Sequence, residues 1–183
     1  MSIPQNDPGT NIRINSDSLI SIADDNKETT LATSNTLNYN SSGSVVLTTT
    51  GVIDYGNQTL PLKRGSILKI DKNKSQNLSV KVTNNTTESQ KINLTAQLNP
   101  GLDDVFSNNL NYLSSNSYQP LAGAPVNVYS TDALAANNGK DITADWFHEN
   151  DQIAGPELKF NSLPNVSTGT HKSQITWTLT VGP

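Results

Sequence analysis

The chain has 183 residues, 33% of them hydrophobic and 15% charged, and its formal net charge is −4 at pH 7. This length is enough for one domain with a substantial core, while the acidic balance and the scattered lysines and arginines exclude nucleic acid as an expected partner. The absence of cysteine excludes disulfides, thiol catalysis and thiolate metal sites, and says nothing about the redox compartment.

The N-terminal segment MSIPQNDPGT lacks the basic start and the apolar run of a signal peptide. No stretch of the chain is long and apolar enough to cross a bilayer, so we expect no transmembrane segment. The protein is then cytosolic or viral, or it is the mature form of an exported protein. We expect residues 1–9 to be a flexible segment and residues 10–183 to form one β domain.

Alternation of apolar and polar residues predicts strands along most of the chain. The segments that show it, in order, are GTNIRINS, SVVLTTTGVIDYG, GSILKIDKNKSQ, NLSVKVTNNTTESQKINLTAQL, APVNVYS, PELKF and HKSQITWTLTVG. In the fourth of these, two alternating arms flank a polar loop of Asn, Thr, Glu and Ser, which predicts an antiparallel hairpin with a long tip.

Helix signals are few. TDALAANNGK has Thr131 or Asp132 as a possible N-cap and Asn-Gly as a stop, and it predicts at most about two helical turns. LDDVFSNNLNYL is a weaker candidate for a helical or irregular insert. The sequence therefore predicts an all-β fold, an antiparallel β-sandwich or barrel-like single domain with one or two short helical inserts.

The C-terminal segment ITWTLTVGP contains the clearest strand of the chain. Ile175, Trp177, Leu179 and Val181 point to one face, and the threonines between them point to the other. Burying a large apolar side chain is worth about 1.5 to 3 kcal/mol, so an apolar face of four such residues favours the core over a ligand surface.

Residues able to carry catalysis or bind metal are sparse. His148 and His171 lie in no nucleophile pattern, so we expect no enzyme and no catalytic residues. ADWFHENDQ gathers Asp145, His148, Glu149 and Asp151, but their spacing matches no metal signature, and DKNKSQN lacks the later ligands of a calcium loop. We therefore expect no metal and no cofactor.

The aromatic pair Trp146 and Phe147 in this loop has two interpretations. Both rings pack into the core of a protein that has few aromatic residues, or they form an exposed platform on which sugar rings stack. The pair is the candidate binding loop of the sequence.

ITWTLTVGP resembles the C-terminal signature of the WxL domain, a cell-surface module of low-GC Gram-positive bacteria. Upstream, GVIDYGNQTLP resembles the family's Asp-aromatic-Gly segment, and NLSVKVTNNTTESQKINLTAQL occupies the place of the hairpin that leads to its first Trp-x-Leu. The resemblance extends from about residue 50 to the end. It departs from the pattern at Ile92, which stands where the first Trp would be and gives Ile92-Asn93-Leu94.

The resemblance implies an extracellular protein without catalytic activity, attached noncovalently to peptidoglycan or another cell-wall glycan, or to a companion membrane-anchored surface protein. A core position tolerates Ile92 in place of an indole and a stacking platform does not, so we expect Trp177, Leu179, Ile92 and Leu94 to be structural. The alternative function is that of a phage virion or fimbrial structural or adhesin subunit, which has the same composition and the same lack of catalytic residues.

Overall fold

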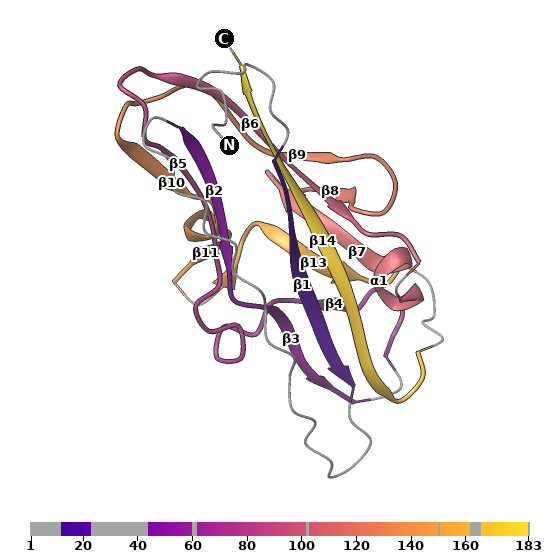
Figure 1. The fold of residues 1–183 in the computed structure, drawn as a ribbon. Coiled ribbons are helices and arrows are strands. Elements are labelled where there is room, and N and C mark those ends of the chain that lie inside the picture. The colour runs from indigo at the N-terminus through magenta and orange to yellow at the C-terminus, as the bar shows by residue number, and fades with distance from the viewer. Residues whose placement is uncertain are drawn as a thin grey trace, which may run out of the picture.

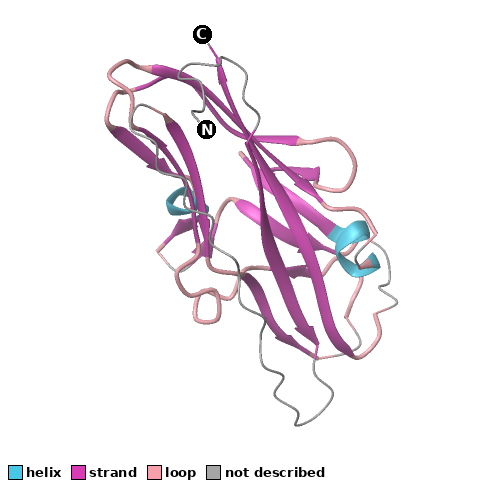
Figure 2. Cartoon of the chain, viewed as in Figure 1, coloured by secondary structure: helices cyan, strands magenta, loops and turns pink. Residues whose placement is uncertain are grey.

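The computed structural model describes residues 12–22, by their backbone, and residues 44–59, 62–101, 103–149, 151–161 and 166–182. The predicted flexible segment 1–9 and the first two residues of the predicted domain lie outside these ranges. Most of the described chain is β-strand (Figure 2). The strands are β1 (Ile12–Ile22), β2 (Val45–Thr50), β3 (Ile53–Gln58), β4 (Ile67–Leu68), β5 (Ser79–Asn84), β6 (Gln90–Leu98), β7 (Leu110–Ser114), β8 (Ser117–Pro120), β9 (Val126–Leu134), β10 (Asn138–Asp141), β11 (Phe147–His148), β12 (Asp151–Gln152), β13 (Gly155–Lys159) and β14 (Gly169–Gly182), with the helix α1 (Asp104–Asn109) and the 3-10 helix η1 (Thr143–Trp146).

The strands form three larger sheets and one small pair (Figure 1). A five-stranded sheet has the order β3-β1-β14-β6-β9, a three-stranded sheet the order β10-β5-β2, and a four-stranded sheet the order β4-β13-β7-β8, while β11 pairs with β12. These pairings are antiparallel except that of β1 with β3, which is parallel. The predicted all-β fold is confirmed.

The strand β14 lies in the middle of the five-stranded sheet, between β1 and β6. Its predicted alternation is confirmed, because Ile175, Trp177 and Leu179 are buried while Thr180 is exposed. In the register with β6, Leu179 lies opposite Leu94 and Val181 lies opposite Ile92. The apolar rows of the two strands therefore continue one another across the sheet.

One hydrophobic core serves all three larger sheets. Trp177 enters it from the five-stranded sheet, Val82 from the three-stranded sheet, and Leu110 and Leu158 from the four-stranded sheet. Because no sheet has a core of its own, the described chain is a single domain.

The predicted hairpin over residues 77–98 is wrong. Its first arm, β5, pairs with β2 and β10, and its second arm, β6, pairs with β14 and β9, so the intervening loop takes the chain from one sheet to another. Asn84 at the end of β5 is buried, and its Nδ2 donates to the backbone oxygens of Glu88 and Leu134, each at 2.8 Å. These bonds hold the loop in a turn away from β5. Alternation indicates which face of a strand is buried, but it does not indicate which strand lies beside it.

The predicted helix in TDALAANNGK is also wrong. Its first residues belong to β9, and β10 begins at Asn138 after a turn in which Asn137 has φ of 52°. The Asn84 side chain binds the carbonyl oxygens of Leu134 and Ala135, and β10 pairs with β5. Sheet pairing outweighs the helix propensity of the alanines.

The weaker helix candidate is confirmed in part. The helix α1 begins after Asp103, whose Oδ1 accepts a hydrogen bond from the backbone N–H of Val105 at 2.8 Å. From Leu110 the chain is strand β7. Asp103 is therefore a typical N-cap, and the helix ends after six residues at Leu110, where the backbone becomes extended.

Candidate functional site

The four predicted motif residues all lie in the core. Trp177, Leu179, Ile92 and Leu94 are each at most 1% exposed, and none of them lies on a surface that a ligand reaches. In this structure the motif strand stabilises the fold, and the binding surface must be sought elsewhere.

Trp146 belongs to the same core. Its indole is fully buried, stacks on that of Trp177 with ring centroids 6.2 Å apart, and donates its Nε1–H to the Tyr112 hydroxyl at 3.0 Å. Gly155 packs so closely that a Cβ there would lie 2.6 Å from the Trp146 ring. The core interpretation is therefore correct for Trp146, and an exposed platform at this residue is wrong.

Phe147, the next residue, is only partly buried. Its ring lies under the ammonium of Lys72, whose Nζ is 4.6 Å from the ring centroid. The same Nζ donates to the backbone oxygen of Glu149 at 2.9 Å. The two aromatic residues of the candidate loop thus have opposite roles, because one fixes the loop to the core and the other remains at the surface.

Phe147 borders a pocket of about 350 Å³. We call it the Phe147 pocket, and its lining consists of Lys72, Ser75, Gln76, Asn77, Leu78, Asp141, Thr143, Ala144 and Phe147. Amide, hydroxyl and small apolar groups make up most of this surface, and the formal charges are one ammonium and one carboxylate.

The carboxylate of the pocket is already bound by neutral donors. Asp141 Oδ1 accepts from the backbone N–H of Thr143 at 3.0 Å and from its hydroxyl at 2.5 Å, and Oδ2 accepts from the Ser79 hydroxyl at 3.1 Å. These bonds spread its charge over three donors. The pocket therefore combines apolar surface with uncharged hydrogen-bonding groups beside one partly exposed aromatic ring.

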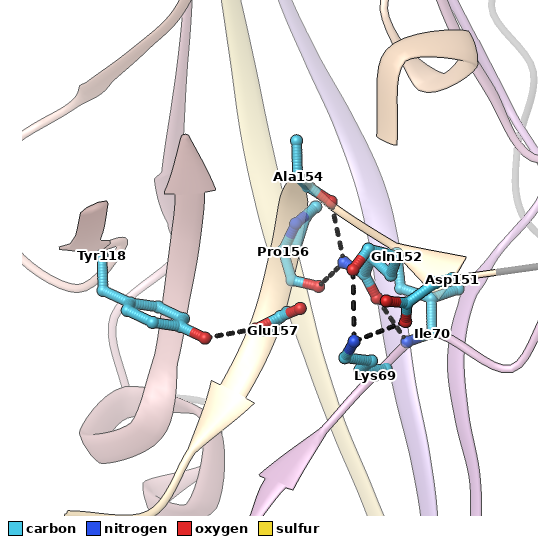
Figure 3. Close-up of polar contacts among 8 residues, drawn as sticks. All are labelled: Lys69, Ile70, Tyr118, Asp151, Gln152, Ala154, Pro156 and Glu157. Carbon is cyan, nitrogen blue, oxygen red and sulfur yellow. Dashed lines mark hydrogen bonds and ion pairs between the residues drawn. The ribbon is translucent and has the colours of Figure 1, made fainter. Parts of the chain in front are cut away.

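The strands β11 and β12, which we call the Phe147 hairpin, are held in place by Gln152 (Figure 3). Gln152 is buried; its Oε1 accepts from the Ile70 N–H at 2.7 Å, and its Nε2 donates to the backbone oxygens of Ala154 at 3.0 Å and Pro156 at 2.9 Å. One side chain thus connects the hairpin to the segment after β4 and to β13.

An ion pair adds to this attachment. Lys69 Nζ donates to Asp151 Oδ1 at 2.6 Å and to the backbone oxygen of Gln152 at 3.2 Å. The hydrogen bond and charge of Lys69 lower the pKa of the exposed Asp151 carboxyl below its usual range. Both partners are well exposed, so the pair adds orientation more than stability.

Beside this network lies the carboxyl group of Glu157, on β13. Glu157 is 1% exposed, and its Oε2 accepts from the Tyr118 hydroxyl at 2.8 Å (Figure 3). Burial raises the pKa of this carboxyl, although the hydrogen bond from Tyr118 opposes the shift. Desolvation, followed by the same hydrogen bond, raises the pKa of Tyr118 to about 12, so the phenol stays protonated as the donor.

The other residues singled out in the sequence do not assemble into a reactive site. Asp145 pairs with Lys140 at 2.5 Å, and His171 Nδ1 lies 2.8 Å from Asp103 Oδ2 while its Nε2 lies 2.9 Å from the backbone oxygen of Ser167. Both ring nitrogens of His171 thus contact acceptors rather than a hydroxyl nucleophile. Within the described ranges, no three His, Asp or Glu side chains lie close enough together to bind a metal ion.

Sequence reasoning missed most of the residues that line or support the pocket. Lys72, Ser75, Gln76 and Asn77 come from DKNKSQN, which the sequence marked only as an incomplete calcium loop. The density of lysine and amide side chains between two strands was the available signal. Nothing in the sequence indicated that this loop faces Phe147, more than 70 residues away.

Comparisons with known proteins add no further assignment, because no family model, no curated protein and no solved structure matches the chain. In the part of the chain that the structure describes, no helix has the length and apolar character needed to span a membrane.

Proposed function

We propose that the protein is a non-catalytic bacterial cell-surface protein that attaches noncovalently to the cell wall, and that the Phe147 pocket contacts the wall glycan. The observation that carries the proposal is a pocket of about 350 Å³ in which a partly exposed aromatic ring borders amide and hydroxyl side chains. Sugars bind to such surfaces by stacking and by uncharged hydrogen bonds. The resemblance of the C-terminal strand to the WxL family supports the extracellular location and a companion surface protein as a second partner.

The chemistry of the pocket predicts the character of the binding. Since Lys72 already contacts Phe147 and Glu149, and Asp141 is bound by three donors, little free charge is offered to a ligand. Retention on walls should therefore depend weakly on salt and be independent of divalent metal. Release by moderate salt or by a chelator would contradict the proposal.

The test is sedimentation of the purified protein with insoluble peptidoglycan. Phe147→Ala should abolish most of the retention, because the ring is the stacking surface, while circular dichroism shows that the variant remains folded. Trp146→Ala is unsuitable for this purpose, since loss of the buried indole would destabilise the fold as well.

Tyr129→Ala is the matched control, because Tyr129 is also a partly buried aromatic residue but lies on the outermost strand β9. It should retain wild-type binding. Loss of binding in Tyr129→Ala with none in Phe147→Ala would move the contact to the sheet edge. Absence of wall binding in the wild type, together with self-assembly into polymers, would favour the virion or fimbrial alternative.

A further inference from the structure

The carboxyl group of Glu157 occupies an unusual environment. The group is buried, and its Oε2 accepts a hydrogen bond from the Tyr118 hydroxyl. The other oxygen, Oε1, has no hydrogen-bond partner among the described residues. Burying an ionised carboxylate with a single hydrogen-bond donor is unfavourable in free energy, because the lost hydration is not replaced. The environment therefore favours the protonated carboxyl, or else the arrival of a second donor.

Four other ionisable groups act on this carboxyl. Lys69, beside the end of β4, and Lys159, on β13, favour its ionised form, while Asp151, on β12, opposes it. Tyr55, on β3, is buried with its hydroxyl unpaired within the described part of the chain, and the negative charge of Glu157 is one cause of the raised pKa of that phenol.

Of the two cations, Lys69 is the one that is bonded to the Phe147 hairpin. The Lys159 ammonium lies over the Tyr118 ring, 4.0 Å from its centroid. Lys69 lies between Glu157 on one side and Asp151 and Gln152 on the other (Figure 3), and its ammonium is bonded to the latter two. A single ammonium thus has one carboxylate partner in the hairpin, and its charge also acts on the carboxyl group of Glu157.

We propose that Glu157 and Asp151 compete for the Lys69 ammonium, so that the proton on Glu157 controls how firmly the Phe147 hairpin is held. With Glu157 protonated, Asp151 is the only carboxylate paired with Lys69 in the described part of the chain, and the ion pair to the hairpin persists. When Glu157 ionises, its unpaired Oε1 in a poorly solvated position attracts the ammonium more strongly than the exposed Asp151 does. Lys69 then shifts toward Glu157, and the hairpin loses this attachment.

The consequence for ligand binding rests on the proposed function, whereas the switch itself does not. Phe147 stands on β11, which pairs with β12, so a loosened hairpin positions the Phe147 ring less precisely at the pocket. Binding through Phe147 should accordingly be tightest in the more acidic range, where Glu157 is protonated, and weaken as the pH rises.

Amide hydrogen exchange of the free protein, followed by NMR, tests the switch without any ligand. The reporters are the N–H groups of Ile153 and Ala154, which donate to the Trp146 oxygen at 2.8 and 3.2 Å next to the hairpin. After correction for intrinsic rates, their protection should fall as the pH rises through the carboxyl 13C midpoint of Glu157. Linkage predicts that the protection factor falls roughly tenfold for each pH unit by which opening of the hairpin lowers the pKa of Glu157.

Two variants decide the interpretation. Glu157→Gln removes the competing charge and should hold protection at its acid-pH level throughout, whereas the control Glu88→Gln, in an exposed loop, should keep the wild-type pH dependence. Asp151→Asn should lower protection even at acid pH, because Lys69 then has no carboxylate partner in the hairpin.

Protection that is independent of pH in the wild type, or that keeps its pH dependence in Glu157→Gln, would overturn the proposal. Should Glu157→Gln not fold, the wild-type titration and Asp151→Asn still decide it. Failure of the protein to bind cell walls would defeat the proposed function and leave these exchange results unaffected.

Discussion

The indole of Trp177 on β14 stacks on that of Trp146, the residue just before the Phe147 hairpin, yet different forces hold the strand and the hairpin in place. β14 has fourteen residues and two neighbouring strands, and from Ser173 to Thr180 buried side chains alternate with partly buried or exposed ones. The hairpin has strands of two residues, and it depends on the Gln152 side chain and on Lys69 for its position. Local sequence pattern therefore builds the core here, whereas contacts between residues remote in sequence build the candidate binding surface.

The largest expected effect of a single substitution is on the β14 side of this comparison. Trp177→Ala should reduce the free energy of unfolding by about 3 to 5 kcal/mol, because it removes a fully buried aromatic ring and leaves a cavity beside Trp146. Denaturant unfolding followed by circular dichroism measures the loss. Thr180→Ala, on the exposed face of the same strand, should change stability by less than about 0.5 kcal/mol. Equal effects of the two substitutions would contradict the assignment of Trp177 to the core.

What the sequence could predict follows the same division. The burial of Ile175, Trp177 and Leu179 could be predicted from their spacing. On a strand with one buried face, every second side chain points to that face, so the apolar residues must be the buried ones. The pairing of β5 was not readable, since its partners β2 and β10 are chosen by tertiary contacts such as those of Asn84. A strand pattern specifies a face and leaves the neighbour open.

The candidate site was less predictable than the fold. The sequence singled out Trp146 and Phe147 as a unit, but the two side chains point into different environments because a 3-10 helix ends at Trp146 and a strand begins at Phe147. Gln152 binds the N–H of Ile70, 82 residues away, and such a bond leaves no trace in local composition. The position of the Phe147 ring at the surface therefore could not be predicted from the periodicity of the sequence.

An intermediate effect is expected where the hairpin leads into β13, at Gly155. This residue has φ of +92°, and a Cβ on it would lie 2.6 Å from the Trp146 ring, so Gly155→Ala combines backbone strain with overpacking. Gly65 is the matched control, because its φ is +84° and a Cβ on it would meet nothing within 4 Å. Gly155→Ala should therefore destabilise the protein by about 1 to 3 kcal/mol more than Gly65→Ala does. Calorimetric unfolding of both variants measures the difference, and equal costs would show that the indole yields to the added methyl group.

The smallest expected effect concerns Glu157 and the pH dependence of stability. Burial raises the pKa of its carboxyl above the ordinary value of 4.5. At a pH between 4.5 and the folded-state pKa, the folded protein therefore keeps a proton that the unfolded chain has released. Stability from this group is complete below the ordinary value and is lost as the pH rises through the folded-state pKa. Glu157→Gln cannot ionise, and its melting temperature relative to wild type should therefore rise as the pH increases from the ordinary value of 4.5 to the folded-state pKa of Glu157. Asp151 acts in the opposite direction through its lowered pKa, and it is present in both proteins. A difference in melting temperature that stays constant over this range would mean that Glu157 is as well solvated in the folded protein as in the unfolded chain.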